Sequence, residues 1–208
     1  MADAITFYTN PMSRGRIVRW MLEEVGRPYD TRVLDYGTTM KAPEYLALNP
    51  MGKVPAIVCD GEVVTECAAI CTFLADRFPE AGLAPGAKEA GRGTYLRWMF
   101  FAAGPLEAAV TAKSMNLMPP ADKAGTLGYG TFEAAVDALE GAVSGDGPWI
   151  LGERFSAADV YVGSQINWGL MFKSIPDRPA FVAYAERLRA RPAYVRASEI
   201  DDALMPKG

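Results

Sequence analysis

The chain has 208 residues, of which 50% are hydrophobic and 22% charged, and its formal net charge is −4. This apolar content predicts a folded protein of one or two domains, and the negative charge argues against nucleic acid and anionic membranes as partners. No apolar run reaches the ~20 residues of a transmembrane helix, and residues 1–11 lack the features of a secretory signal, so we expect a cytoplasmic protein.

The sequence contains no histidine and three cysteines, Cys59, Cys67 and Cys71. Without histidine, the Ser-His-Asp and Cys-His mechanisms and all His-ligated metal sites are excluded. A small, odd number of cysteines indicates a reducing compartment and not a disulfide scaffold. We therefore expect no metal, and an enzyme with this composition would act by orienting groups or by electrostatics.

The first eighty residues alternate strand and helix patterns. Residues 4–8 form a β-branched and aromatic run that Asn10-Pro11 ends. Apolar residues at helical spacing over 17–25 predict a helix that stops at Gly26, and residues 29–34 read as a second strand. Because a helix connects these two strands, we expect them to be parallel with a right-handed crossover.

A hairpin and a helix complete this region. Residues 54–59 and 62–65 flank Asp60-Gly61, which is the strongest short hairpin signal in the chain. Thr65 is predicted as the N-cap of a helix over 66–77. The expected order is therefore β-α-β followed by β-β-α.

A Pro/Gly-rich stretch follows, and beyond it the strand patterns fade. We therefore predict an α/β domain over 1–78, a linker over 79–87 and an all-helical domain over 88–208. The expected helical segments lie near residues 88–111, 121–143, 156–172, 179–190 and 193–204. Gly104-Pro105 is expected to kink or break the first of them, and Ser156 with Asp159 has the form of a capping box.

The segment 10–16 lies at the carboxyl end of the first parallel strand, where ligands bind in open α/β sheets. Ser13 is expected at or just before the start of a helix, where free amides and the helix dipole favour an anion. An ordinary N-cap is the more common use of a serine there. Both interpretations remain open at the level of sequence.

Two further segments fit a peptide-like ligand. The backbone of Val54 could pair with an extended peptide if the bond to Pro55 were cis, although trans is the common form. Helix amides at 65–67 could bind a carboxylate, and Glu66 an ammonium group, so together they suit an amino-acid zwitterion. The alternatives are ordinary capping and, for Cys67 and Cys71, structural thiols.

Four segments together resemble the cytosolic glutathione S-transferases over nearly the whole chain: NPMSRGR, NPMGKVPAIV, TECAAICTFLADRFP and FSAADVYVG. The resemblance implies a thioredoxin-like N-terminal domain (βαβ-ββα) and an all-α C-terminal domain. It also implies glutathione as co-substrate, a cis Val54–Pro55 bond and a homodimer.

By position, the resemblance assigns glutathione binding to Lys41, Lys53, Val54, Pro55, Glu66 and Cys67. Val54 would pair with the cysteinyl part, Glu66 and Cys67 would hold the γ-glutamyl end, and the lysines would meet the glycyl carboxylate. Two positions depart from the family pattern. Cys67 stands where serine is usual, and Met40 stands where some classes have histidine.

The thiol-activating residue has three candidates. Ser13 resembles the catalytic serine of the plant phi class and is favoured. Asn10 comes second, at the position where theta-like and delta-like enzymes have serine and some bacterial relatives asparagine. Tyr8 comes third.

The implied activity is conjugation of the glutathione thiolate to small hydrophobic electrophiles, bound near Met12, Trp98 and Phe101. One alternative is a glutathione-dependent isomerase or disulfide reductase/peroxidase. The other is a non-catalytic protein of the same fold that binds ligands or partners.

Overall fold

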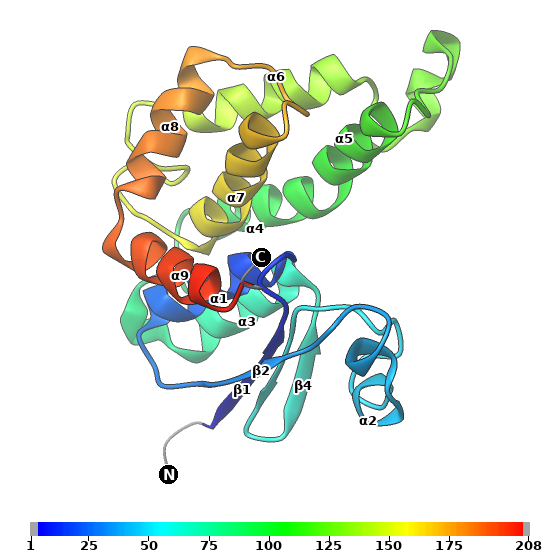
Figure 1. The fold of residues 1–208 in the computed structure, drawn as a ribbon. Helices are drawn as coiled ribbons and strands as arrows, with labels where there is room; N and C mark the ends of the chain where they lie inside the picture. Colours follow the sequence, from blue (N-terminus) through cyan, green and yellow to red (C-terminus); the bar gives the residue numbers. More distant parts are fainter. Residues whose placement is uncertain (1–3, 206–208) are drawn as a thin grey trace. The chain divides into compact units, whose positions relative to one another are not determined.

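The computed structural model describes residues 4–205, which form two compact units (Figure 1). Unit 1 comprises residues 4–83 together with 191–205, and unit 2 comprises residues 84–190. These units differ from the predicted domains 1–78 and 88–208, because the last helix and residues 79–83 belong to unit 1. Among the described residues, no helix is long and apolar enough to cross a bilayer.

Unit 1 contains a four-stranded mixed sheet in the order β2-β1-β3-β4. Its strands are β1 (Ile5–Thr9), β2 (Asp30–Val33), β3 (Ala56–Cys59) and β4 (Glu62–Thr65). Strand β1 runs parallel to β2 and antiparallel to β3, and β3 pairs with β4 in an antiparallel hairpin around Asp60-Gly61. The predicted parallel pair and hairpin are both confirmed.

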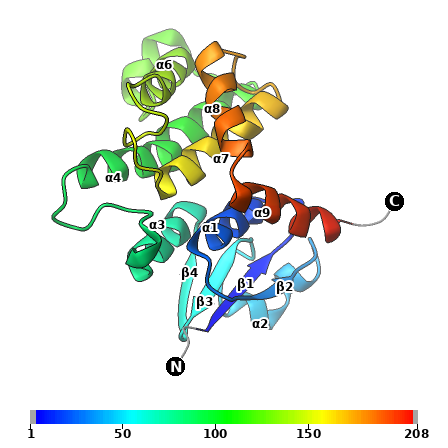
Figure 2. The ribbon, with the colours of Figure 1, turned by 90° about the vertical axis from the view of Figure 1, so that its left-hand side faces the viewer.

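The helices of unit 1 are α1 (Gly15–Val25), α2 (Pro43–Leu46), α3 (Cys67–Arg77) and α9 (Pro192–Ala203), with 3₁₀ turns at Thr39–Lys41 and Pro79–Ala81. Helix α1 covers the sheet face of Phe7, over whose ring the Arg19 guanidinium lies. Tyr8 points to the opposite face, because successive strand residues alternate, and its ring packs on Tyr45 of α2. Figure 2 shows α1 and α2 on opposite faces of the sheet.

The prediction that Thr65 caps α3 is wrong. Thr65 still belongs to β4, where it pairs with Ala56. The chain turns only at Glu66, whose φ of 69° lies in the left-handed region, and α3 begins at Cys67 without a side-chain cap. Strand pairing therefore takes precedence over the capping preference of threonine.

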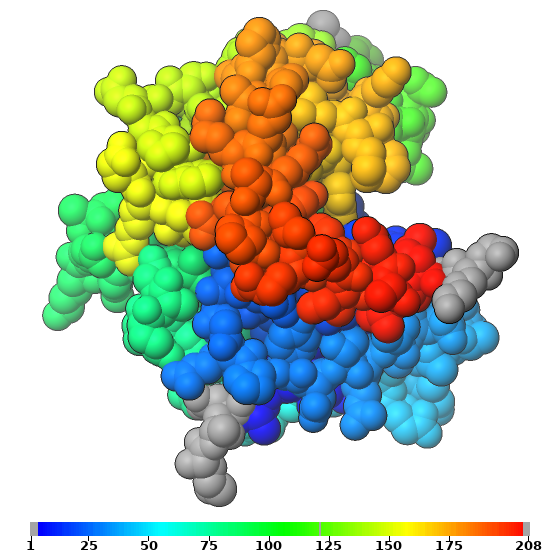
Figure 3. Space-filling view, turned by 60° about the vertical axis from the view of Figure 1, so that its left-hand side comes forward, coloured from blue at the N-terminus to red at the C-terminus, as the bar shows by residue number. Residues whose placement is uncertain are grey.

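Among the described residues, four ion pairs link α1 to α9 and to Arg191, the residue before it, and the space-filling view shows α9 lying against α1 (Figure 3). The pairs are Arg16–Asp202 at 2.6 Å, Arg19–Asp201 at 2.7 Å, Arg191–Glu24 at 2.7 Å and Arg196–Glu23 at 3.2 Å. In α1, and in α9 with the residue before it, the arginines precede the acidic residues along the chain. Opposite charges therefore meet when the two helices run antiparallel.

Unit 2 contains α4 (Arg92–Phe101), α5 (Glu107–Ser114), α6 (Phe132–Val143), α7 (Ala157–Met171) and α8 (Pro179–Arg189), with a 3₁₀ segment at Ala121–Thr126. A π-helical segment, Ala102–Leu106, joins α4 to α5. It contains Gly104-Pro105, so the predicted disturbance appears as a change of helix type. Pro105 has no N–H to donate, and a π-bulge accommodates such a gap in the ladder.

The predicted capping box at the start of α7 is confirmed. The Ser156 amide and hydroxyl donate to Asp159 Oδ2 at 2.8 and 2.9 Å. Asp159 Oδ1 accepts from the Ile150 amide at 2.8 Å and from the Tyr184 hydroxyl at 2.6 Å. This one buried carboxylate thus joins α7 to the preceding loop and to α8.

Candidate functional site

The loop between β1 and α1 is held in place by Asn10, which is buried. The Asn10 carboxamide donates from Nδ2 to the Leu34 carbonyl at 2.8 Å and accepts at Oδ1 from the Met12 amide at 2.9 Å. Both ends of this side chain are therefore engaged. Asn10 ties the loop to the chain that leaves β2, which is a structural use of the residue.

Ser13 lies two residues before the first residue of α1. Its hydroxyl accepts from the Gly15 amide at 2.9 Å and donates to the Asn10 carbonyl at 2.7 Å. The first of these bonds satisfies an amide at the helix start, as a cap does. The hydroxyl thus lies at the amino end of α1, where the helix dipole favours negative charge.

Gly15 lets the chain pass close to the end of β1. A Cβ at this position would lie 1.9 Å from Oγ1 of the buried Thr9 and 3.0 Å from the Ser13 hydroxyl oxygen. We expect Gly15→Ala to lower the free energy of unfolding by about 1–3 kcal/mol, as overpacking does. Chemical denaturation tests this, with Gly93→Ala as control, because a Cβ there meets nothing within 4 Å. An unchanged stability would contradict the close approach.

A second loop, before β3, repeats the arrangement of the first. Asn49 is buried, its Oδ1 accepts from the Met51 amide at 3.1 Å, and its Nδ2 donates to the Lys53 carbonyl at 2.8 Å. The Tyr45 hydroxyl also donates to the Lys53 carbonyl, at 2.5 Å. Sequence reasoning missed Asn49, although the tripeptide Asn-Pro-Met occurs at both loops and is the signal that could have found it.

The bond that follows this loop, between Val54 and Pro55, is cis. The resemblance implied this isomer, and that expectation is confirmed. The alternative, the more common trans bond, is not observed at this position. Pro55 is buried and Val54 is half-buried. The backbone of Val54 stands just before β3, where an extended ligand could pair with it.

The two lysines differ in what they contact. Lys41 Nζ donates to the carbonyls of Met51 and Gly52 at 3.1 and 2.9 Å, so it closes the loop before β3. An ammonium group has three donors, and these bonds use two. Lys53 is exposed, and Met40, where some family classes have histidine, is buried. Lys41 can therefore stabilise the loop and still offer charge to an anion.

Helix α3 starts next to the loop that precedes α1. The Cys67 thiol lies 3.6 Å from the Arg14 carbonyl and donates to it, and Cys67 is buried while Glu66 is exposed. Burial raises the pKa of the Cys71 thiol well above its ordinary value, and Cys67 adds to this shift. Cys71 is therefore an inert core thiol at neutral pH.

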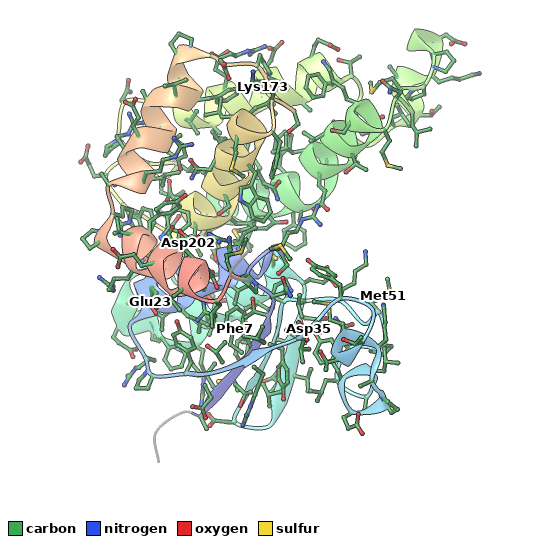
Figure 4. The ribbon with its side chains drawn as sticks, in the orientation of Figure 1. Phe7, Glu23, Asp35, Met51, Lys173 and Asp202 are labelled. Carbon is green, nitrogen blue, oxygen red and sulfur yellow. The ribbon has the colours of Figure 1, made fainter. Side chains whose placement is uncertain are left out.

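Tyr8, the third candidate for thiol activation, contacts an aromatic ring of α2. It lies on the α2 face of the sheet, with its ring centroid 5.5 Å from that of Tyr45. Ser13 and Asn10 share one loop and one hydrogen bond. The structure therefore brings Ser13 and Asn10 together in one loop, whereas Tyr8 packs on Tyr45. Figure 4 labels Phe7, the residue before Tyr8 in β1.

The residues expected near an electrophile fall in both units. In unit 1, Met12 is 57% exposed, and Met51 at the matching place of the second loop is 64% exposed. In unit 2, Trp98 is buried and Phe101 half-buried, with their rings edge to face at 5.3 Å. Trp98 therefore serves as helix core, whereas Met12 has an apolar side chain available to a ligand.

Comparison with known proteins agrees with this arrangement. The family model described as the N-terminal domain of glutathione S-transferase matches residues 12–77, and the one for the C-terminal domain matches residues 107–168. Glutathione S-transferase GstA of Escherichia coli O157:H7 is 29% identical over 79% of this chain and 79% of its own. Disulfide-bond oxidoreductase YfcG of Escherichia coli K12 is 26% identical over 91% and 92%. The crystal structure of a glutathione transferase from Methylococcus capsulatus has a TM-score of 0.79 and 30% identity, covering 96% of this chain and 99% of its own.

Proposed function

Because the chain belongs to the glutathione S-transferase family, we propose that it binds glutathione on unit 1 and transfers the thiolate to small hydrophobic electrophiles. The observation that carries the proposal is the Ser13 hydroxyl at the amino end of α1, in a loop held by a buried asparagine. In this proposal the serine hydroxyl stabilises the sulfur anion.

The energy of this contact is sufficient to lower the pKa of the glutathione thiol without a general base. A hydrogen bond to a charged group contributes about 1.5–3 kcal/mol, and the neutral bond to Asn10 that must be given up contributes about 0.5–1.5 kcal/mol. The helix terminus adds ~0.3–1 kcal/mol. The net of about 1–2 kcal/mol lowers a thiol pKa of ~8.5 by about one unit. The Asn10 carbonyl keeps its bond from the Ser13 amide, so the loop need not open when the hydroxyl turns.

Asn10 is proposed to act by holding this loop, because both ends of its carboxamide are already engaged. Tyr8 is given no role in activating the thiol, because its ring packs on the α2 face of the sheet. The remaining assignments follow the resemblance. Val54 with Pro55 would meet the cysteinyl backbone, Glu66 and Cys67 the γ-glutamyl end, and Lys41 and Lys53 the glycyl carboxylate. We also propose a homodimer, which sedimentation analysis tests.

The name of one relative, a disulfide-bond oxidoreductase, favours a second candidate activity. The same glutathione thiolate can attack a sulfur atom instead of a carbon atom. It would form a mixed disulfide and release a thiolate, and a second glutathione would then complete the reduction. Parallel assays with an aryl halide and with a small dialkyl disulfide separate the two activities.

The Ser13→Ala variant tests the proposed role of the hydroxyl. We expect the pKa of bound glutathione, followed by the ultraviolet absorbance of its thiolate, to rise by about one unit, since the charge-assisted bond is lost. Ser13→Thr keeps a hydroxyl and should retain most of the lowering.

A serine that acts only as a cap gives a different result. Stability would then fall by about 1 kcal/mol while the thiol pKa stays at the wild-type value. That outcome would remove Ser13 from catalysis. A wild-type protein that binds glutathione without lowering its pKa would overturn the proposed activity itself.

A further inference from the structure

Arg16, in the first turn of α1, joins the loop of Ser13 to the last helix of the chain. Its Nε donates to the Pro11 carbonyl at 2.6 Å, and its Nη2 donates to Asp202 Oδ1, also at 2.6 Å. The two contacts use different nitrogens of one planar guanidinium group. A continuous path of hydrogen bonds therefore runs from the loop through Arg16 to α9.

The peptide between Pro11 and Met12 is held from both sides. Arg16 binds its carbonyl, and the Asn10 carboxamide binds its N–H group, which belongs to Met12. Proline has no N–H, so this carbonyl is the only backbone polar group by which Pro11 can be anchored. Because Met12 directly precedes Ser13, the orientation of this peptide determines the direction of the backbone at Ser13. Arg16 and Asn10 thus both anchor this peptide, and the Tyr36 hydroxyl donates to the next carbonyl, that of Met12, at 3.4 Å.

The ion pair on its own contributes little to stability. The side chains of Arg16 and Asp202 are 29% and 66% exposed, and exposed pairs of this kind typically contribute less than ~1 kcal/mol. A planar guanidinium nevertheless fixes direction well, because its donors form a rigid fork. We therefore expect this pair to matter more for the orientation of the loop than for the free energy of unfolding.

We infer that Arg16 and Asp202 are positioning residues, through which α9 sets the orientation of the Pro11–Met12 peptide and hence of the Ser13 hydroxyl. Asp202 holds the guanidinium, and the guanidinium holds the loop. The effect on catalysis rests on the proposed function. The anchoring of the loop does not, because it can be measured in the protein without a ligand.

Three variants and one control test the inference. Asp202→Ala removes the acceptor, and Arg16→Lys leaves a single amine that cannot donate to both partners in this geometry. Asp202→Asn keeps an oxygen acceptor and should behave like the wild type. The control is Arg196→Ala, which breaks another pair between α9 and α1, with Glu23, at the opposite end of α1 from the loop.

The first measurement is hydrogen exchange of the segment 10–14 in the ligand-free protein. We expect exchange of the Met12 amide to be faster by about tenfold in Asp202→Ala and Arg16→Lys, because local opening becomes easier. Asp202→Asn and Arg196→Ala should leave it unchanged. Equal exchange in all variants would overturn the anchoring, whatever the activity.

The second measurement is the pKa of bound glutathione, together with kcat and KM. We expect Asp202→Ala to raise the thiol pKa and lower kcat several-fold at an unchanged KM for glutathione, since its binding residues lie elsewhere. Faster exchange with an unaltered thiol pKa would refute the link from loop to hydroxyl. If the variants exchange faster but the wild-type protein does not lower the thiol pKa, the anchoring of the loop stands and the proposed function is rejected.

Discussion

Replacing Asp159 with alanine is expected to lower the free energy of unfolding by about 3–5 kcal/mol. The carboxylate accepts hydrogen bonds from the Ile150 amide, from the Ser156 amide and hydroxyl, and from the Tyr184 hydroxyl. Alanine leaves these buried donors without their acceptor, and each unsatisfied donor costs about 1–3 kcal/mol before relaxation. Urea denaturation measures the loss, which corresponds to roughly 6–20 °C in Tm for a chain of this size.

A second cap in the same unit provides the control. The Thr131 hydroxyl accepts from the Ala134 amide at 3.0 Å at the start of α6, and this contact is exposed. Thr131→Ala should therefore cost only about 1 kcal/mol. If Asp159→Ala cost no more than Thr131→Ala, the buried carboxylate would be an ordinary cap and not a joint between α7, the preceding loop and α8.

The pH dependence of this loss has a definite sign. Burial raises the pKa of Asp159 above its ordinary value of 3.8, even though the hydrogen bonds oppose the shift. The folded state therefore retains the proton at a pH where the unfolded state has lost it. The tighter binding of this proton by the folded state adds stability. That contribution has its whole value below pH ~4 and is lost as the pH rises through the folded pKa. The stability of wild type relative to Asp159→Asn should decrease over that interval. A relative stability that rises with pH would contradict the direction of the shift.

The features that could be predicted from sequence are those that neighbouring residues determine. Asp60-Gly61 predicted the hairpin, because a tight turn of this kind favours that dipeptide. Gly26 ends α1 with a φ of 71°, as its freedom in the left-handed region predicts. The capping box at Ser156 likewise involves residues only three positions apart. In each case the controlling interaction lies within a few residues.

The features that escaped prediction depend on contacts between distant residues. Helix α9 was expected in the helical domain, yet its partners Glu23 and Glu24 lie more than 160 residues away along the chain. Charge order within one helix does not reveal which other helix it meets. Arg16 was missed for the same reason, since only the folded chain brings Asp202 to it. Of the candidate site, the residue pattern indicated the loop of Asn10 and Ser13, and the family resemblance implied the cis bond at Pro55. The anchoring contacts of Asn10 and Arg16 were not predicted.

The buried pair Arg19–Asp201 is expected to be as costly to break as the Asp159 network. The two side chains are 1% and 0% exposed, and Nε lies 2.7 Å from Oδ1. Arg19 Nη1 also donates to the Tyr29 hydroxyl at 3.2 Å and to Thr31 Oγ1 at 3.1 Å. Asp201→Ala should lower the free energy of unfolding by about 3–5 kcal/mol, because it leaves an uncompensated charge inside unit 1. The exposed pair Arg27–Glu80 is the matched control, and its loss should cost less than ~1 kcal/mol.

Replacing both Arg19 and Asp201 is expected to lower the free energy of unfolding less than replacing either one. Among the described residues, Arg19 Nη2 and Asp201 Oδ2 are buried without a hydrogen-bond partner, so the pair does not fully compensate for its removal from water. Arg19→Met with Asp201→Leu removes both charges, and apolar replacements of buried pairs are often neutral or stabilising. In a double-mutant cycle, the double variant should therefore be more stable than either single variant. Additive losses would mean that the two charges do not act as a unit.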